Sequence, residues 1–579
     1  MKNPEVAQLL YGIADMLEMQ NVSFKPAAYR KAARNVETNS EDIEELFRKG
    51  GREALMGIPG VGESIAEKIA EFLETGKLGY HDELKLKFPQ HVAELMNVPG
   101  IGPKKIKLLH DKLGIKTVAQ LEAAAHSHKI SKLAGFGTKS EDGILKGVEI
   151  FKGGQARMLL GYALPIAQEI ESRLMALKES IQVSVAGSTR RRKETIGDVD
   201  ILVSCKSKSA AAGVMDFFTT LPEVSRILAK GETKSSIILK TGLQVDLRVI
   251  DDASFGAALQ YFTGSKEHNV LVREIAIKKG LKLNEYGVFK KGTGRKLAGR
   301  TEEDVYRAIG LRYIEPELRE NTGEIEAAAN NKLPSLVKYG SIKGDFHVHT
   351  VKSDGANPID GMVAAAKQLG YEYVAITDHS KSERIAHGLS NEEMEKWLKD
   401  IRALAARAKG IKVLAGSEVD ILPNGELDFP DDLLKKMGVV IGSVHSRFKS
   451  TKEEMTNRIL AALENRHLDI LGHPTGRLIG KREPFEFDMK KVFAAAADKK
   501  IMLEINAHPE RSDLKDAHAR EAKSYGCKFV INTDAHSTEG LKFMNLGVAI
   551  ARRAWLSPED VVNTKPLKEL PRFFRKIRH

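Results

Sequence analysis

The sequence predicts a multidomain protein with a helical N-terminal region, a mixed α/β middle and a barrel-like α/β C-terminal part. A chain of 579 residues is too long for one hydrophobic core. Residues 1 to about 150 follow the 3.6-residue period of amphipathic helices, and short β-branched runs, at 181–185, 199–203, 237–239 and 245–250, first appear after residue 151. After about residue 344, helical segments alternate regularly with six strand-like runs, as in a barrel-like α/β domain. These six runs are 373–376, 412–414, 439–441, 468–471, 501–505 and 528–531.

The composition is that of an ordinary globular protein with an excess of basic residues. Hydrophobic residues make up 42% of the chain, the formal net charge is +12 and the pI is about 9.2. A basic excess suits a polyanionic partner, because a Lys or Arg placed on a phosphate releases a condensed counterion. The only cysteines, Cys205 and Cys527, exclude a disulfide framework and a zinc ribbon. Without a secretory signal or a long apolar run, we expect a cytoplasmic protein and no membrane span.

A glycine motif recurs in the helical N-terminal region. IPGVGESIAEKI (58–69) and VPGIGPKKIKLL (98–109) both place an apolar-x-Gly-x-Gly turn before a helix, and LAGFGTKSEDGI (133–144) is a weaker copy. The glycines allow a tight turn, and the following helix presents unpaired N–H groups to a phosphate. We therefore expect helix-hairpin-helix modules that bind the DNA backbone without reading its sequence. The expected DNA contacts are Gly60, Gly62, Gly100, Gly102, Lys104 and Lys105.

Lys68 lies on the helix after the first hairpin, with Lys25, Tyr29 and Lys31 upstream. A lysine close to other cations gives up its proton more easily, so it can attack a sugar aldehyde and form a Schiff base. A solvated lysine on a helix surface has the same local sequence, so both interpretations stay open here.

The stretch AGSTRRRKETIGDVDILV (186–203) has the residues of a triphosphate site. Asp198 and Asp200 alternate along a predicted strand, so their carboxylates lie on one face. Carboxylates this close repel one another, which divalent cations between them would relieve. The preceding turn at Gly187 and Ser188 is rich in donors, and three arginines follow it. A third acid, Asp246 in LQVDLRVI, is expected on a neighbouring strand.

These motifs and their order resemble the family X DNA polymerases. G-S-x-x-R, G-D-x-D-I-L, V-D-L-R and Y-F-T-G-S with a following Asn and Arg occur in the family's order, and the likeness spans residues 1 to about 318. The resemblance implies a lyase-like helical domain with the first hairpin (1–85), a helix-hairpin-helix DNA-binding domain (86–150), an α/β nucleotidyltransferase palm (151–252) and a nucleotide- and template-binding thumb (253–318). It also implies that Asp198, Asp200 and Asp246 hold two Mg²⁺ or Mn²⁺ ions.

The resemblance assigns the remaining residues of the polymerase site by their place in the motifs. Tyr261, Phe262 and Gly264 would pack against the sugar, Asn269 would contact the base edge and Arg273 the template. The triphosphate contacts implied are Gly187, Ser188, Arg191 and Gly197. Arg157 is a further candidate for a phosphate contact by its spacing alone.

The N-terminal residues are also similar to the family's deoxyribose-phosphate lyase domain. NVSFKPAAYRKAA (21–33) and GVGESIAEKIAEFL (60–73) match it, with Lys68 at the Schiff-base position. Ser64 and Phe24 stand where the lyase members carry a phosphate-binding lysine and a histidine. The missing cation weakens the expected grip on a 5′-phosphate.

After a polar stretch with Pro316 and Pro334, in which we expect a linker at 319–340, histidines and acids gather at predicted strand ends. In GDFHVHTVKSDG (344–355), His347 and His349 lie two apart on a predicted strand. The other ligand types are Asp354, Asp378, His379, Glu418, His445, His473, Glu504, Asp534 and His536. Such folds place their chemistry at strand ends, and mixed imidazole and carboxylate ligands favour Mn²⁺, Zn²⁺ or Fe²⁺ over Mg²⁺ or Ca²⁺ alone.

Residues 341–579 resemble a PHP (polymerase and histidinol phosphatase) domain. The resemblance implies a distorted α/β barrel that holds two or three Mn²⁺ and/or Zn²⁺ ions and hydrolyses phosphate esters. The implied ligands are His347, His349, Asp354, His379, Glu418, His445, His473, Asp534 and His536. Because none is missing, we expect a working hydrolase. Arg384, Arg477 and Arg511 lie near the ligand motifs, either as substrate contacts or as ordinary surface arginines.

Together these features predict a DNA-directed DNA polymerase that fills short gaps in base-excision-type repair and carries a C-terminal metal-dependent phosphoesterase. We expect it to act as a monomer on gapped or primer-template DNA with deoxynucleoside triphosphates. Whether the phosphoesterase is a 3′-5′ exonuclease, an abasic-site endonuclease or a 3′-end phosphatase stays open. Two alternatives remain: an end-processing nuclease or phosphatase whose polymerase half mainly binds DNA, and a nucleotidyltransferase acting on a small molecule or RNA.

Overall fold

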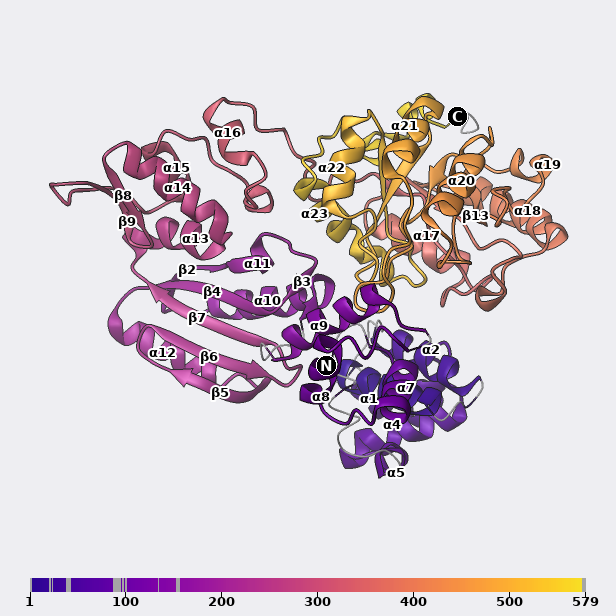
Figure 1. Cartoon of the computed structure of the whole chain (residues 1–579), viewed down its shortest axis with the longest axis horizontal. Coiled ribbons are helices and arrows are strands. Elements are labelled where there is room, and N and C mark those ends of the chain that lie inside the picture. The colour runs from indigo at the N-terminus through magenta and orange to yellow at the C-terminus, as the bar shows by residue number, and fades with distance from the viewer. Residues whose placement is uncertain are drawn as a thin grey trace.

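The structure is a computed structural model that describes residues 3–19, 22, 24–37, 43–86, 95, 98, 101–133, 135–152 and 157–574. A helical N-terminal region, a sheet with a small helical lobe, and a barrel follow one another along the chain (Figure 1). This arrangement confirms the predicted fold class. None of the described helices combines the length and hydropathy that crossing a lipid bilayer requires.

The N-terminal region contains two helical cores. The first is formed by α1 (Asn3–Met19), α2 (Lys25–Glu37), α3 (Ile43–Met56), α4 (Glu63–Thr75) and α5 (Gly79–Leu86). The second contains α7 (Pro103–Leu113), α8 (Val118–His126) and α9 (Thr138–Lys152). Local sequence sets the helix ends: a capping box of Thr117 and Gln120 starts α8, and Gly76, with φ +70°, ends α4.

The palm region, from β1 to β7, is built on a five-stranded sheet in the order β2-β4-β7-β6-β5. Its strands are β2 (Ser180–Val185), β4 (Asp198–Cys205), β5 (Val224–Lys230), β6 (Lys234–Leu239) and β7 (Gln244–Ile250). The short strands β1 (Met158–Leu159) and β3 (Thr195–Ile196) pair separately. The four strands predicted from the sequence, 181–185, 199–203, 237–239 and 245–250, are confirmed. The edge strand β5 was not predicted, because most of its side chains are exposed and it lacks an apolar run.

The two faces of this sheet have different partners. Helices α10 (Leu160–Met175) and α12 (Lys208–Thr219) share one core with Val199, Ile201 and Val245. On the opposite face, Leu202 packs against α13 (Phe255–Thr263). Since side chains alternate along a strand, the even-numbered residues of β4 and β7 face α13.

The thumb region, from α13 to α15, is the small lobe at the upper left of Figure 1. It contains α13, α14 (Lys266–Lys278), β8 (Leu281–Asn284), β9 (Gly287–Lys290), β10 (Lys296–Ala298) and α15 (Glu302–Ala308). Its core includes Val272, Val305 and the fully buried Tyr306.

Residues 319–340, where the sequence predicts a linker, are packed onto the thumb core. The segment includes α16 (Glu324–Ala329), and Ile325, Ala328 and Leu336 join the core. Arg319 has no exposed surface: its guanidinium lies 2.6 Å from Glu302 and over the Tyr306 ring. Two charged residues of this polar segment, Arg319 and Glu324, are buried in ion pairs, whereas most of its other polar side chains are exposed.

The C-terminal region is a nearly closed barrel of seven parallel strands in sequential order. The strands are β11 (Gly344–Asp345), β12 (Tyr373–Ile376), β13 (Lys412–Asp420), β14 (Val439–Ser443), β15 (Ile470–Leu471), β16 (Met502–Asn506) and β17 (Phe529–Asn532). The longer helices are α17 (Ile359–Gln368), α18 (Asn391–Arg407), α20 (Lys452–Leu463), α21 (Met489–Lys499), α22 (Asp516–Ser524) and α23 (Met544–Arg553). All six strands predicted after β11 are confirmed.

The first and last strands approach each other through a single parallel bridge between Val348 and Ala535. The prediction that His347 and His349 lie on a strand is therefore wrong in detail. They lie in an extended segment after β11, because β11 pairs only through Gly344 and Asp345.

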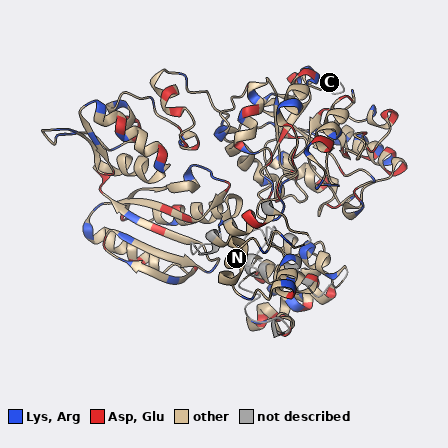
Figure 2. Cartoon of the chain, viewed as in Figure 1, with Lys and Arg blue, Asp and Glu red and all other residues tan. Residues whose placement is uncertain are grey.

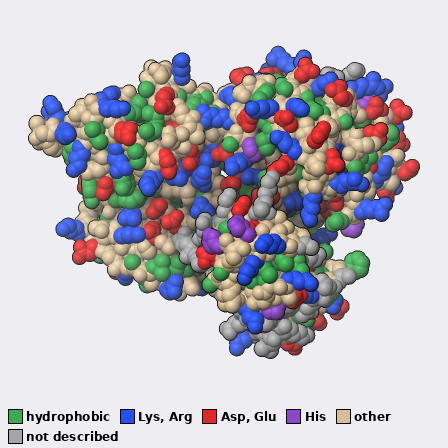
Figure 3. Space-filling view, in the orientation of Figure 1, with side chains coloured by type: hydrophobic (Ala, Val, Ile, Leu, Met, Phe, Trp, Pro, Cys, Tyr) green, Lys and Arg blue, Asp and Glu red, His purple; other side chains and the backbone are tan. Residues whose placement is uncertain are grey.

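The barrel interior is apolar at one end and polar at the other. Phe346, Tyr373 and Phe574 fill the amino ends of the strands, with ring centroids 4.7–5.2 Å apart. Leu414 of β13 also faces inward, so the strand alternation directs Glu418 and Asp420 into the carboxyl end. Acidic and basic side chains are mixed over the whole face drawn in Figure 3, so net charge alone does not locate a binding path.

Candidate functional site

The three carboxylates predicted for the palm converge on the sheet face next to the thumb. In the parallel pair β4 and β7, Asp200 lies opposite Asp246 and Asp198 opposite Gln244. Both central strands carry acidic residues in Figure 2. Burial, followed by the charges of Asp198 and Asp246, raises the pKa of Asp200 to about 6. A divalent cation would relieve this repulsion.

Asp246 has a cation partner within the protein. Lys234 Nζ lies 2.6 Å from its Oδ2, and Gln244 Nε2 donates to Oδ1 at 2.9 Å. Burial alone would raise the pKa of Asp246, but these two groups lower it. The all-carboxylate donor set fits Mg²⁺ or Mn²⁺. Among the described residues, the trio is not gathered within 4.8 Å as the barrel ligands are.

Gly187 lies directly against Asp200 of this trio. Its φ is +63°, and a Cβ there would lie 2.7 Å from Asp200 Oδ2. A side chain at this position would therefore displace the carboxylate. Ser188 follows in α11 (Gly187–Arg190), and Gly197 is buried just before β4.

The arginines that follow Ser188 are already engaged within the protein. Arg190 makes a bidentate pair with Glu302, with its Nη2 2.6 Å and its Nη1 2.9 Å from the two oxygens. Arg191 donates to Thr263 O and lies 3.0 Å from Glu320. Of the three arginines in this motif, Arg190 is therefore taken up by Glu302, and its guanidinium joins the palm to the thumb.

The predicted sugar and template contacts lie at the start of the thumb. Tyr261 and Phe262 pack edge to face with centroids 5.1 Å apart, and Phe262 lies under Arg248. Asn269 is buried and bonded to Gln260 and to the Tyr261 carbonyl, at 2.7 Å each.

Three other predicted contacts have simpler surroundings. Gly264 has a φ of +70°, and a Cβ added to it would lie 3.0 Å from Arg191 Nη1. Arg273 is exposed on α14. Arg157 is bonded to Thr195 through its side-chain oxygen and its carbonyl, at 2.9 and 2.6 Å.

The N-terminal hairpins have the backbone geometry that the repeat predicts. Gly60 has φ +82°, and Gly62 and Gly102 are the N-caps of α4 and α7 with nearly equal dihedral angles. Neither cap offers a side-chain acceptor, so no capping side chain satisfies the N–H groups at the start of these two helices. Lys105 lies beside the Phe136 ring. Gly100 and the Lys104 side chain fall outside the described residues.

Lys68 is tied to its own helix. Its Nζ donates to Ser64 Oγ at 2.9 Å and to Ser64 O at 3.0 Å, and it lies 4.8 Å from the centroid of the Tyr80 ring. Phe24 is 91% exposed. The residues that depart from the lyase pattern are therefore a serine bonded to the lysine and a solvated aromatic ring.

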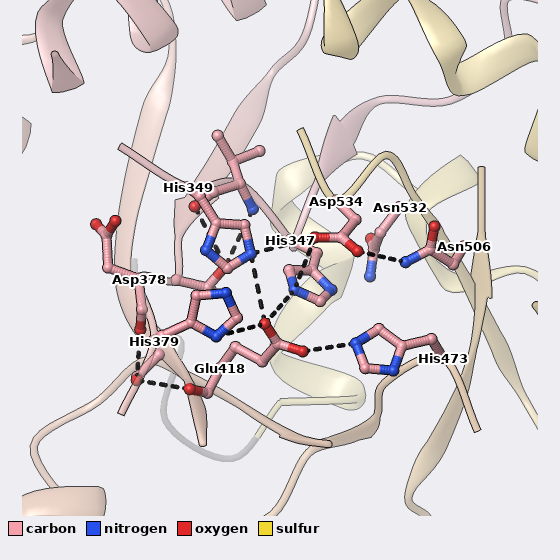
Figure 4. A network of polar contacts seen from close by, with 12 residues as sticks. His347, His349, Asp378, His379, Glu418, His473, Asn506, Asn532 and Asp534 are labelled. Atoms are coloured by element: carbon pink, nitrogen blue, oxygen red, sulfur yellow. Dashed lines mark hydrogen bonds and ion pairs between the residues drawn. The ribbon is translucent and has the colours of Figure 1, made fainter. Parts of the chain in front are cut away.

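The structure brings all nine predicted barrel ligands together around Glu418. Figure 4 shows Glu418 with five of the others, His347, His349, His379, His473 and Asp534. Glu418 Oε2 lies 3.1–3.5 Å from nitrogens of His347, His349 and His379. Its Oε1 lies 3.3 Å from His445 and 2.7 Å from His473. The two oxygens of one carboxylate thus face different imidazoles, as in a carboxylate that bridges cations.

Two further acids complete the cluster. Asp534 Oδ1 lies 3.2 Å from His349, and Asp354 Oδ1 lies 3.2 Å from His536 and 3.6 Å from His379. Four overlapping groups have ligand atoms within 4.8 Å of one another: His347, His349, Glu418 and Asp534; His349, Asp354, His379 and His536; His379, Glu418 and His445; and Glu383, Asp420 and His445. His473 contacts Glu418 but belongs to none of them.

The chemistry of these atoms fits bound cations. The nitrogens His347 Nε2, His379 Nδ1 and His445 Nε2 are buried and make no hydrogen bond within the described residues, although carboxylate oxygens lie 3.1–3.3 Å away. Nitrogen lone pairs that converge with carboxylate oxygens without hydrogen-bond geometry are the arrangement of ligands around a shared ion.

The charges within the cluster support the same conclusion. Burial alone would lower the pKa of His445 and His536, but the surrounding carboxylates raise them to about 10 and about 9. Burial alone would raise the pKa of Glu418, but His347, His379 and His445 hold it well below its usual range. The acids therefore favour positive charge between them.

Other carboxylates orient the imidazoles. Glu504 Oε1 lies 2.7 Å from His347 Nδ1, and Asp420 Oδ1 lies 2.5 Å from His445 Nδ1. Asp378, considered as a ligand from the sequence, instead accepts from Thr350, Ser353 and Trp397. Sequence reasoning missed Asp420, although its place two residues after Glu418 on one strand was a usable signal.

The three candidate arginines separate in the structure. Arg511 Nε lies 3.1 Å from Asp534 Oδ2, at the ligand cluster. Arg477 turns away and pairs with Glu194 of the palm region at 2.8 Å. Arg384 is exposed on the loop after β12.

Family models match the chain in the predicted order. Those of a helix-hairpin-helix domain and a SAM-like helix-hairpin-helix tandem match residues 1–78 and 92–149. Those of the DNA polymerase beta palm and thumb match 163–277 and 258–320, and that of the PHP domain matches 345–508.

Three relatives illustrate the similarity. The DNA polymerase/3′-5′ exonuclease PolX of Bacillus subtilis (strain 168) is 37% identical over 579 residues and the match covers all of both chains. A probable phosphatase of Thermoanaerobacter sp. (strain X514) is 28% identical over 233 residues, 38% of this chain and 89% of its own. DNA polymerase lambda of Rattus norvegicus is 25% identical over 349 residues, 55% of this chain and 56% of its own.

Proposed function

Because the chain belongs to the family X DNA polymerases that carry a C-terminal PHP domain, we propose that it fills short gaps in DNA and processes blocked 3′ ends in one polypeptide. It is a DNA-directed DNA polymerase with a metal-dependent phosphoesterase. The observation that carries the proposal is the presence of two separate clusters, the palm carboxylates and the barrel ligands, each suited to divalent ions.

In the palm, Asp198, Asp200 and Asp246 would hold two Mg²⁺ or Mn²⁺ ions. Bound there, the ions would supply Lewis-acid chemistry that lowers the pKa of the primer 3′-hydroxyl and offsets the charge of the leaving pyrophosphate. Ser188 and the backbone around Gly187 and Gly197 bind the triphosphate, and Arg191 adds a guanidinium.

The start of the thumb completes the nucleotide site. Tyr261, Phe262 and Gly264 pack against the sugar, Asn269 contacts the base edge and Arg273 the template. Since Asn269 already bonds to Gln260 and the Tyr261 carbonyl, the base contact requires an exchange of one of these partners.

In the barrel, the nine ligands would hold two or three Mn²⁺ and/or Zn²⁺ ions, which would supply a nucleophilic water and stabilise the charge on the leaving oxygen. Glu504 and Asp420 hold His347 and His445 in the orientation that ligation requires. Arg511, beside Asp534, is placed to bind a substrate phosphate. The substrate we favour is the 3′ end of a DNA strand, because a 3′-hydroxyl is what the polymerase half needs next.

The helix-hairpin-helix modules bind the DNA backbone through the N-termini of α4 and α7, where the capping glycines provide no side chain. Lys104 and Lys105 assist this binding. We also propose 5′-deoxyribose-phosphate lyase activity at Lys68. The bond from Lys68 to Ser64 supplies no cation for the 5′-phosphate, so this activity is expected to be weak.

A paired substitution tests the division of labour. Asp198→Ala should abolish extension of a primer on gapped DNA, and His347→Ala should abolish removal of a blocked 3′ end on the same substrate. If the wild-type protein with Mg²⁺ or Mn²⁺ failed to extend the primer, the polymerase assignment would be wrong.

The second candidate, an end-processing nuclease or phosphatase with an idle palm, is favoured by the similarity of the barrel to a probable phosphatase. It predicts that Asp246→Asn leaves all measurable activity unchanged. Sedimentation at several concentrations tests the expected monomer.

A further inference from the structure

The palm loop that follows Ser188 is bound to the rest of the chain by every charge it carries. This RRRKE segment (190–194) runs from the last residue of α11 to the residue before β3. Its contacts are Arg190 with Glu302, Arg191 with Glu320, Arg192 over the Tyr339 ring, Lys193 with Glu320, and Glu194 with Arg477. Three of these partners lie beyond the palm and thumb regions, so the loop is a junction between the two halves of the molecule.

Arg553, the last residue of barrel helix α23, contacts Arg191 in this junction. Its Nη1 donates to the Arg191 carbonyl at 2.8 Å and lies 3.1 Å from Glu320 Oε1. Its Nε and Nη2 lie 2.8 and 2.7 Å from Asp516 Oδ2. The side chain is buried, so Asp516 holds the guanidinium while its other edge faces the palm loop.

Glu320 bridges the side chains of Arg553 and Arg191. Its Oε1 lies 3.0 Å from Arg191 Nε and 3.1 Å from Arg553 Nη1. Arg191 Nη1 also donates to Thr263 O. Two of the three guanidinium nitrogens of Arg191 are therefore fixed by protein groups, and the contact with Thr263 O leaves Nη2 for another acceptor.

The loop is held by these charges more than by packing. A cavity of about 140 Å³ lies between the RRRKE segment and the barrel. Its walls include Arg192, Lys193, Lys515, Leu546 and Arg553. At the wall of this cavity the palm and barrel are in tight contact, since a Cβ on Gly161 would lie 2.6 Å from Pro509. Loss of the ion pairs would thus free the loop without separating the two halves.

We propose that Arg553 and Glu320 are positioning residues for nucleotide binding by the polymerase, so that the barrel supplies part of the support of the triphosphate site. The proposal rests on the proposed role of Arg191 as a triphosphate contact. A guanidinium held in one orientation loses less side-chain entropy when it binds phosphate than one that is free to rotate. Arg553 of the barrel holds Arg191 in this way from 362 residues away in the sequence, and Glu320 of the segment that connects the two halves does so from 129 residues away.

The test is single-nucleotide insertion on one-nucleotide-gapped DNA by the full chain. Arg553→Met and Glu320→Gln should each raise the KM for the incoming nucleotide about three- to tenfold, with kcat within twofold. The Kd for the gapped DNA should not change. The double variant should be no worse than the more affected single variant, because both act through Arg191. Arg553→Lys, which restores the charge, should recover part of the loss.

Arg552 provides a matched control. It is the adjacent buried arginine, and it pairs with Glu317 at 2.8 Å and donates to Val337 O, but it reaches the RRRKE segment only through the Tyr339 ring. Arg552→Met should lower the Tm and leave the nucleotide KM unchanged. An equal rise in KM for Arg552→Met would mean general loosening of the interface and would overturn the proposal.

Arg191→Met separates the two hypotheses. If it leaves the KM unchanged, the proposed triphosphate role of Arg191 fails and the positioning role fails with it. If it raises the KM while Arg553→Met and Glu320→Gln do not, only the positioning role fails. A fall in KM for Glu320→Gln would show that Glu320 competes with the triphosphate, which also contradicts the proposal.

Discussion

Gly187→Ala should disable the polymerase while sparing the phosphoesterase. The backbone of Gly187 has φ +63°, which costs an alanine about 1–2 kcal/mol. The added Cβ would lie 2.7 Å from Asp200 Oδ2, whereas ordinary contacts begin near 3.4 Å. The carboxylate must therefore retreat by about 0.7 Å, the difference between these two distances.

Such a shift is large for a group that positions reacting atoms. A misplacement of about 1 Å costs roughly a hundredfold in rate, so we expect primer extension to fall between tenfold and a hundredfold. The assay is single-turnover extension on gapped DNA at saturating nucleotide with Mg²⁺. Removal of a blocked 3′ end by the barrel should proceed at the wild-type rate.

Gly242 provides the control for backbone strain. It lies in the turn between β6 and β7 with φ +84°, and nothing lies within 4 Å of an added Cβ. Gly242→Ala should lower stability by a similar amount but leave extension intact. Wild-type extension by Gly187→Ala, or equal impairment by Gly242→Ala, would refute the argument from the contact with Asp200.

Three further predictions concern charge and metal. Burial and the neighbouring carboxylates raise the pKa of Asp200 to about 6 from its ordinary value of 3.8, so ionisation of Asp200 opposes folding. The stability that protonated Asp200 contributes is present below about pH 4 and is lost as the pH rises through about 6. Asp200→Asn should therefore raise the unfolding free energy of the palm at pH 7 in EDTA by up to roughly 3 kcal/mol, with no gain at pH 4, as followed by urea denaturation; equal gains at both pH values would contradict this. Glu302 lies between Arg190 and Arg319, so Glu302→Gln should destabilise the thumb by about 3–5 kcal/mol, and a calorimetric change below about 1 kcal/mol would show the triad to be unimportant. Chelation of metal should lower the Tm of the barrel. Addition of Mn²⁺ or Zn²⁺ at a hundredfold excess over Kd should restore the Tm, because binding raises the unfolding free energy by about 2.7 kcal/mol per site, and His347→Ala should lose much of this response. An unchanged Tm would mean that the cluster binds no ion.

Local sequence was sufficient to predict the elements that carry the chemistry. Strands such as 199–203 and 439–441 were predictable because runs of β-branched residues are buried on both faces of their sheets. Asp198 and Asp200, and likewise Leu414 and Glu418, share one face of their strand because they are two and four residues apart. That they lie on the same face could therefore be predicted before any packing was known. The glycine hairpins were recognisable because their turns require residues without a Cβ.

Contacts between residues far apart in the chain were decided only by the tertiary structure. The linker prediction depended on polarity, but a polar side chain is solvated or buried according to its partner, and the partner of Arg319 is 17 residues away at Glu302. Asp420 at the end of β13 orients His445, which follows β14. Arg553 donates to the carbonyl of Arg191, which is 362 residues away in the sequence. Sequence patterns report the local backbone period and the side chains it exposes, whereas ion pairing depends on distances that arise only when separate elements pack together.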